Sequence, residues 1–239
     1  MRVGAGVVAI CLVLGAVLPG APGEARRDRG VIWLFLVDDL HIDFRTTGIV
    51  RAWLSSFVKD LIQQEDAFAA RTTGPSNVSV GLLAGVADLE AGMRRVSGSG
   101  LKREQVQKIP EAAGEIVYRA KIALKAATEF LAIAPAHDPR RRIMLYIGKG
   151  FDADDPLSDE IQKLLTEAWR LDCTLIALDP SVLPGAQALA PHLPDAERLR
   201  GINARRGSLE GFALPTNGFV LADEASVRDA AARIAKAVR

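Results

Sequence analysis

The stretch Val31-Ile-Trp-Leu-Phe-Leu-Val37, followed at once by Asp38-Asp39-Leu40-His41-Ile42-Asp43, decides the fold of this chain. A continuous apolar run that is rich in β-branched and aromatic residues is typical of a strand buried on both faces. Such strands lie in the middle of parallel sheets that helices cover on both sides. Because ligands of open α/β sheets bind at the carboxyl ends of the strands, we expect segment 38–43 to lie at the binding edge.

The rest of the chain alternates strand patterns with helix patterns. Apolar runs predict further strands at residues 66–73, 78–82, 143–147, 172–178 and 218–221, of which 78–82 has the pattern of a short edge strand. Apolar residues three and four positions apart predict helices at residues 46–62, 86–96, 109–131, 157–171 and 227–238, and a polar helix is expected near residues 195–206. This alternation predicts an α/β fold, with three layers and a doubly wound, mostly parallel sheet of about six strands.

Two connections are expected to be irregular. Residues 97–100, Ser-Gly-Ser-Gly, predict a flexible loop, and residues 137–142 predict a polar connection whose three arginines lie in solvent.

Composition and charge limit the possible partners. The chain has 239 residues, of which 49% are apolar and 25% charged, and its net charge is +1. This composition is globular, and one domain over residues 30–239 is long enough to bury a full core. A charge so close to zero gives no footprint for nucleic acid, so we expect no nucleic-acid partner.

The first 25 residues have the form of a secretory signal peptide. Arg2 precedes an apolar run at residues 7–18, and residues 19–25 supply a helix break and small residues. The apolar run is shorter than the roughly 20 residues that span a bilayer, so we expect cleavage rather than an uncleaved anchor. The mature chain would then have no integral membrane span and would be exported to the periplasm or outside the cell. Cys173, its one remaining cysteine, is expected to be a small buried hydrophobe.

Several phrases of the sequence resemble the von Willebrand factor type A (vWA) domain, most closely its divergent branch in secreted bacterial proteins. They are the apolar strand into Asp38, Arg71-Thr-Thr-Gly74, Arg94-Arg-Val-Ser-Gly-Ser-Gly-Leu101 and Arg141-Arg-Ile-Met-Leu-Tyr-Ile-Gly-Lys-Gly-Phe151. The resemblance covers about residues 30 to 239. It implies a doubly wound α/β fold with a small antiparallel edge strand, and a role in binding another protein.

Many members of that family hold a divalent metal at the top of the sheet, through an Asp-x-Ser-x-Ser loop, a threonine and a late aspartate. Here Asp38 matches the first aspartate, but Leu40 and Ile42 stand at the serine positions and offer no oxygen. Lys149 stands at or next to the late aspartate. We therefore expect that this metal site is lost and that no cofactor is bound. Two roles of Lys149 stay open: it neutralises Asp38 directly, or it is a solvated loop lysine that never meets Asp38.

The candidate ligand-binding residues at the top of the sheet are Asp38, Asp39, His41, Asp43, Thr73 and Lys149. The resemblance predicts an exported protein-interaction module that is not an enzyme. Two alternatives remain open: a divalent-metal-dependent adhesion module that uses Asp38, and a hydrolase on an α/β scaffold. The carboxylate cluster alone motivates the hydrolase. Alternation along an extended loop would also let Asp39, His41 and Asp43 chelate a transition metal.

Overall fold

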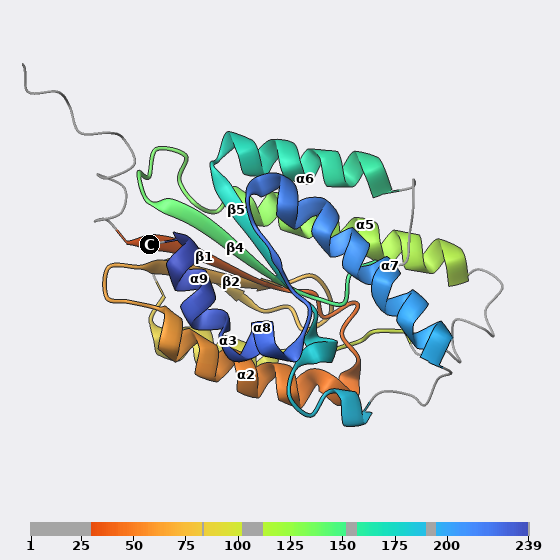
Figure 1. Ribbon diagram of the computed structural model, residues 1–239. Coiled ribbons are helices and arrows are strands. Elements are labelled where there is room, and N and C mark those ends of the chain that lie inside the picture. The colour runs from red at the N-terminus through yellow and green to blue at the C-terminus, as the bar shows by residue number, and fades with distance from the viewer. Residues whose placement is uncertain (1–29, 83, 102–111, 152–156, 190–194, 239) are drawn as a thin grey trace, which may run out of the picture.

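The computed structural model describes residues 30–82, 84–101, 112–151, 157–189 and 195–238. Within them the chain forms a six-stranded sheet with the order β3-β2-β1-β4-β5-β6 (Figure 1). The strands are β1 (Val31–Val37), β2 (Ala67–Thr72), β3 (Ser79–Val80), β4 (Arg141–Ile147), β5 (Cys173–Leu178) and β6 (Val220–Leu221). All pairings are parallel except that of β3 with β2, which is antiparallel. The predicted α/β fold and its edge strand are confirmed.

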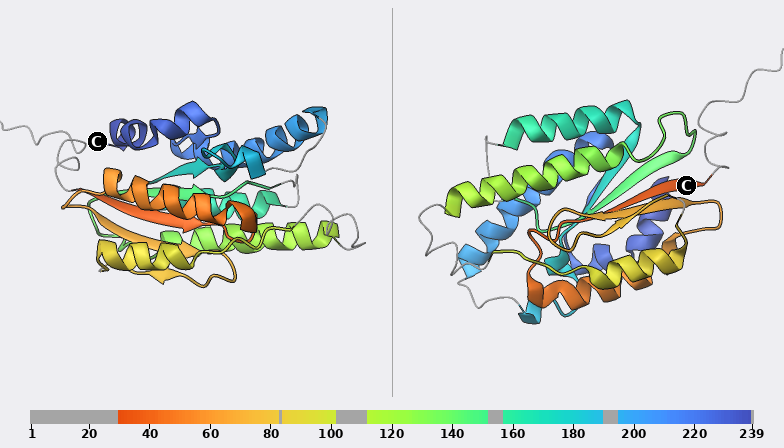
Figure 2. Two further views of the ribbon diagram at one scale, coloured as in Figure 1. Left: turned by 90° about the horizontal axis from the view of Figure 1, so that it is seen from below. Right: turned by 180° about the vertical axis from the view of Figure 1, so that it is seen from behind.

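Helices cover both faces of the sheet (Figures 1 and 2). One face carries α2 (Thr47–Leu61), α3 (Val86–Arg95), α8 (Glu224–Arg228) and α9 (Ala230–Val238), and the other carries α5 (Ala112–Leu131), α6 (Ser158–Arg170) and α7 (Asp195–Ala213). The helix predicted at 227–238 is two helices, because the chain turns between Arg228 and Ala230. The predicted start of the 109–131 helix and the signal peptide at 1–25 lie outside the described residues.

Strand β1 is the centre of both cores, and all seven of its residues are buried. Trp33, Phe35 and Val37 belong to the core beneath α2, whereas Ile32, Leu34 and Leu36 belong to the core beneath α5. This division follows the period-two alternation of side chains along a strand.

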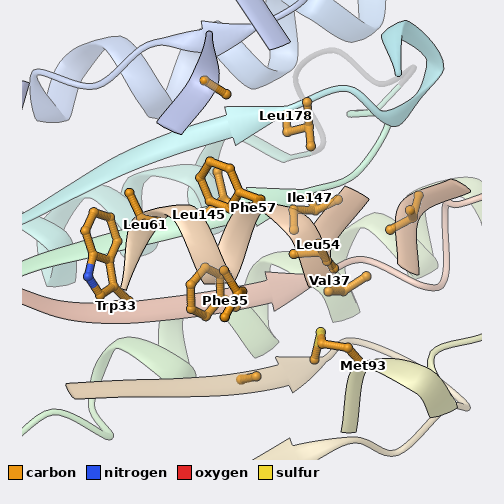
Figure 3. Close-up of a cluster of buried hydrophobic side chains, with 14 of the residues drawn as sticks. Trp33, Phe35, Val37, Leu54, Phe57, Leu61, Met93, Leu145, Ile147 and Leu178 are labelled. Carbon is orange, nitrogen blue, oxygen red and sulfur yellow. The ribbon is translucent and has the colours of Figure 1, made fainter. Parts of the chain in front are cut away.

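Helix α2 supplies aromatic side chains to the first of these cores. Phe57 is 4% exposed, and its ring stacks on that of Trp53 with a centroid distance of 4.5 Å. Figure 3 shows Phe57 among Leu54, Leu145 and Ile147, above the sheet. The apolar stripe predicted for this helix is therefore the one that it buries.

The prediction of a solvated connection at residues 137–142 is wrong for Arg142. Its side chain is buried at the start of β4, where its guanidinium donates to the backbone carbonyls of Leu171 (2.9 Å), Pro135 (2.6 Å) and Asp138 (3.1 Å). A guanidinium carries five N–H donors, which lets one buried arginine join carbonyls of the segment after α5 to the carbonyl of Leu171, which follows α6. The sequence pattern of three arginines in a polar segment does not reveal this role.

Two further observations concern redox chemistry and membranes. Cys173 is buried as predicted, and burial raises the pKa of its thiol to about 12, which keeps it protonated and unreactive.

Among the described residues, no helix combines the length and apolarity needed to cross a membrane.

Candidate functional site at the carboxyl edge of the sheet

The parallel strands bring three of the predicted site residues together. Asp38 and Asp39 follow β1 directly, and Thr73 follows β2. The backbone N–H of Asp38 donates to the carbonyl of Ile147 (2.8 Å), and that of Thr73 donates to the carbonyl of Val37 (3.1 Å). The ladder thus continues past the strand ends and fixes these residues. Both aspartates are fully buried.

The carboxylate of Asp38 is held by three side-chain donors. Its Oδ1 accepts from the hydroxyl of Thr73 (2.8 Å), and its Oδ2 accepts from His41 Nδ1 (2.7 Å) and from the hydroxyl of Tyr146. Burial, followed by the Asp38 charge, raises the pKa of Tyr146 well above its ordinary value, so the phenol stays a donor. Hydrogen bonds from three donors compensate for the burial of this carboxylate.

Tyr146 was not among the residues predicted for the site. It lies in β4, opposite Leu36 of β1, and its ring meets that of Phe212 edge-on at 5.2 Å. Leu36 and Asp38 lie two positions apart and share one face of the sheet. The signal in the sequence was a hydroxyl-bearing residue inside the otherwise apolar run Ile143-Met-Leu-Tyr-Ile147.

Asp39 has a different role, which is to hold the chain that follows β2. Its carboxylate accepts the backbone N–H groups of Gly74 (2.6 Å) and Ser76 (2.8 Å). Its backbone carbonyl accepts both the N–H (2.7 Å) and the hydroxyl (3.0 Å) of Ser99. One residue therefore joins the ends of β1 and β2 to the segment after α3.

Residues 97–100 form a loop, as predicted, and hydrogen bonds to distant segments anchor it. The N–H of Gly98 donates to the hydroxyl of Thr47 (2.9 Å), and that of Gly100 donates to the carbonyl of Ile42 (2.9 Å). A Cβ atom at Gly98 would lie 2.3 Å from the carbonyl oxygen of Ile42. Glycine is required here because two backbone segments cross in contact, which is a different reason from flexibility.

His41 and Asp43 point to different partners. The carboxylate of Asp43 accepts from the backbone N–H (2.9 Å) and the Nη2 (2.8 Å) of Arg45, while His41 turns back to Asp38. The hydrogen bonds from Arg45 hold the pKa of Asp43 at about 2. Segment 38–42 forms a turn, because the N–H groups of His41 and Ile42 both donate to the carbonyl of Asp38. The extended geometry needed to chelate a metal through Asp39, His41 and Asp43 is therefore not present.

The far nitrogen of His41, Nε2, is buried and has no hydrogen-bond partner among the described residues. The His41 ring meets that of Phe151 edge-on at 5.2 Å. Because an ionised carboxylate only accepts hydrogen bonds, Nδ1 carries the hydrogen that faces Asp38.

Lys149 does not neutralise Asp38, so the first of its two expected roles is wrong. Burial lowers the pKa of Lys149, while Asp43 and Asp179 attract the ammonium and Arg205 and Arg45 repel it. Among the described residues, Lys149 makes no ion pair within 4.0 Å. The chain passes Asp38 at Gly148, where an added Cβ would lie 2.8 Å from the Cβ of Asp38.

The residues at this edge do not fit a divalent cation. Both oxygens of Asp38 and both of Asp39 accept hydrogen bonds from protein donors. Leu40 and Ile42 offer no oxygen, and Ile42 is fully buried in the core. Among the residues that the structure describes, no three histidine, cysteine, aspartate or glutamate side chains are grouped to hold a metal.

The accessible part of the site is its rim. Phe44, which sequence reasoning passed over, is 70% exposed, the largest exposed fraction recorded for a large apolar side chain of the described residues. It follows Asp43 and precedes Arg45, whose side chain is 47% exposed. A short 3-10 helix, η1 (Phe44–Thr46), holds these residues, and the Asp43 side chain caps it.

Comparisons with known proteins place the fold. No protein-family model matches this sequence, and neither does any curated protein. Among solved structures, the chain is similar to an aerotolerance-related membrane protein from Bacteroides fragilis NCTC 9343, crystallised with multiple mutations to serines. The TM-score is 0.54 and the identity 11%, over 87% of this chain and 98% of that chain. At this identity the likeness concerns the α/β fold alone.

A second solved structure is the pilus adhesin SpaC from Lactobacillus rhamnosus GG in an open conformation. Its TM-score is 0.48 and its identity 13%, over 88% of this chain and 30% of that chain.

Proposed function

We propose that this chain is an exported protein-interaction module with a vWA-like fold, whose binding does not depend on a divalent cation at Asp38. The observation that carries the proposal is the occupancy of Asp38. This carboxylate is fully buried, and three protein donors take the places that metal ligation would need. In the family that the sequence resembles, this aspartate belongs to the metal site. Here the carboxylate of Asp38 accepts hydrogen bonds from side chains inside the protein.

The rim offers a surface that a protein partner would recognise. Phe44 stands 70% exposed beside Arg45, and Arg45 is oriented by its bonds to Asp43. Aromatic and arginine side chains dominate the binding energy of protein interfaces. Three factors support the rim as the contact surface: its place at the carboxyl edge of the sheet, its exposed aromatic ring and its fixed arginine.

The hydrolase alternative finds less support. A general base must reach a substrate proton, at a heavy-atom distance of about 2.6–3.2 Å or through one water. Asp38 and Asp39 are fully buried and engaged, and the Nε2 atom of His41 is covered. We therefore propose a binding role rather than catalysis. Export rests on the signal-peptide pattern at residues 1–25.

The rim is tested by affinity capture from the envelope fraction of the source cell, with EDTA in the buffer and quantitative mass spectrometry as readout. We expect wild-type protein to retain a defined partner that Phe44→Asp loses. Leu214→Asp is the matched control. Leu214 is also an exposed apolar side chain, at 56%, and it lies in the segment before β6, whereas the rim follows β1. A partner that Phe44→Asp still captures in full would place the contact elsewhere.

The metal-dependent alternative is tested by calorimetry on the unmodified protein. Titration with Mg²⁺, Mn²⁺ and Ca²⁺ should give no saturable heat in the micromolar range. Tight binding of any of these cations that Asp38→Asn abolishes would favour the adhesion module that uses a metal, and would refute our proposal.

A further inference from the structure

Among the described residues, no strand pairs with the outer edge of β3. Ser79 pairs with Arg71 of β2 and Val80 pairs with Ala70, and β3 stands at the end of the strand order. The carbonyl of Val78 accepts from the N–H of Thr72 (3.1 Å). Because ladder bonds alternate along an antiparallel pair, residues 78 and 80 direct their backbone groups at β2. The N–H and C=O of Ser79 and the N–H of Gly81 therefore face outward.

This edge is accessible along a groove. On the α3 side, a groove of about 400 Å³ is lined by Ser79, Val80 and Gly81 of the edge and by Asp88, Gly92 and Arg95 of the helix. A Cβ atom at Gly92 would lie 2.9 Å from Val80, so glycine lets α3 pack closely beneath the strand. At Gly81 an added Cβ atom would meet open space. The backbone of an incoming strand has room to approach.

A second groove lies on the other face of the same edge. It has a volume of about 520 Å³, and Ser79 lines it together with Thr73, Glu129 and Ile133. An added strand projects alternate side chains to opposite faces of a sheet. Its side chains would therefore enter both grooves in turn.

The α3 groove holds one carboxylate and one guanidinium, and the carboxylate of Asp88 is engaged by the N–H of Gly85 (3.0 Å), which leaves Arg95 to favour an acidic occupant. Arg95 is exposed, lines the α3 groove and makes no salt bridge with any described residue, whereas Arg94 pairs with Glu90 at 4.0 Å. The N–H of Ser97 donates to the hydroxyl of Ser76 (2.8 Å), which holds the end of α3 beside the Ser79 end of the strand. An unpaired guanidinium there attracts a carboxylate and repels a second copy of the same edge.

We propose that the edge of β3 is a docking site for an extended, acidic segment of a partner protein, which adds to the sheet as a further strand. Main-chain hydrogen bonds to Ser79 and Gly81 would supply affinity. A carboxylate near Arg95 would supply specificity. This site is separate from the rim at Phe44 and does not rest on the function proposed above.

The probe is a capped peptide, acetyl-Thr-Val-Thr-Val-Thr-Glu-amide, titrated into isotope-labelled full-length protein and followed by NMR. In the antiparallel orientation its glutamate lies on the α3 face at the Arg95 end. We expect the amide signals of Ser79, Val80 and Gly81 to shift in a saturable manner. Ser79→Pro should abolish these shifts, because it removes the outward N–H without removing a ladder bond.

Charge recognition is measured with a second peptide that has glutamine in place of the glutamate. Arg95→Glu should weaken the glutamate peptide about three- to tenfold and leave the glutamine peptide unchanged. Arg94→Glu is the matched control, because Arg94 does not line the groove, and it should affect neither peptide.

A peptide-side test covers the case in which Ser79→Pro fails to fold. Methylating alternate amide nitrogens of the peptide should abolish binding for the set that faces β3 and preserve it for the other set. Several results would overturn the proposal: no saturable shift at millimolar peptide, shifts centred on Phe44, or equal binding by Ser79→Pro or by both methylated peptides. Phe44→Asp should leave peptide binding unchanged, which separates this test from that of the rim.

Discussion

Tyr146 donates its hydroxyl hydrogen to Oδ2 of Asp38, across the two central strands of the sheet. Both side chains are buried, and Thr73 and His41 complete the set of donors around the carboxylate. Tyr146, Thr73 and His41 thus supply the hydrogen bonds that compensate for the burial of the Asp38 carboxylate. The arrangement has consequences for stability that can be measured.

Removing the phenol should destabilise the protein. Tyr146→Phe leaves one oxygen of a buried carboxylate with a donor fewer, and hydrogen bonds to charged groups contribute about 1.5–3 kcal/mol. We expect a loss of that size in urea unfolding. Tyr118→Phe, at a tyrosine that is 61% exposed, is the control and should change the free energy of unfolding by less than about 0.5 kcal/mol. Equal stabilities of Tyr146→Phe and wild type would show that the hydroxyl does not support Asp38.

Lys149→Met should be tolerated. Burial lowers the pKa of Lys149, and no carboxylate of the described residues lies within 4.0 Å of it to form a close pair. Lys149 is half-buried, so an apolar side chain of similar volume removes the desolvation cost of its ammonium without breaking a close ion pair among the described residues. We expect the free energy of unfolding to stay within about 1 kcal/mol of wild type, or to rise. A loss of about 3–5 kcal/mol, as for a broken buried ion pair, would restore the predicted pairing with Asp38.

The stacked aromatic pair of α2 predicts a large core effect. Phe57→Ala removes a ring that is 4% exposed, and truncations of this kind cost about 3–5 kcal/mol. Phe44→Ala makes the same chemical change at a ring that is 70% exposed and should cost less than about 0.5 kcal/mol. Thermal and urea unfolding of the two variants measure this difference. If both melt together, the buried face of α2 is not the one described.

Asp43 should make stability depend on pH in the acid range. Its pKa is about 2 in the folded protein against an ordinary value of 3.8, so folding favours the ionised form. That contribution is complete above about pH 4 and is lost as the pH falls through about 2. Asp43→Asn should therefore be less stable than wild type at pH 7, and the difference should shrink between pH 4 and 2. A difference that stays constant over this range in urea unfolding would show that Asp43 is not preferentially ionised by its Arg45 bonds.

The fold was predictable because apolar pattern dominates it. An unbroken apolar run such as Val31–Val37 is stable as a strand only when both of its faces are buried, between two layers of helices. Strand β4 has the same character. Strand ends then follow from the pattern, which is why Asp38, Asp39 and Thr73 were predicted to lie together.

The partners within the site were not predictable in the same way. Whether Asp38 meets Lys149 or Tyr146 depends on which side of β4 each side chain leaves, a matter of one residue in register. Residues 97–100 and Arg142 show a second limit. Their sequences suit solvent, but backbone groups from distant segments give them buried partners. A local sequence pattern reflects the properties of its own residues and does not specify which distant backbone carbonyls they will contact.

The contacts of Asp39 carry a consequence for the order of folding. This residue bonds to Gly74, 35 positions later, and to Ser99, 60 positions later. Closing chain loops of that length has an entropic cost that contacts within a single helix avoid. The turn after β1 therefore acquires its final shape only when β2 has paired with β1 and α3 has docked. We therefore expect the carboxyl edge of the sheet to form late in folding, after the strands and helices that contribute residues to it.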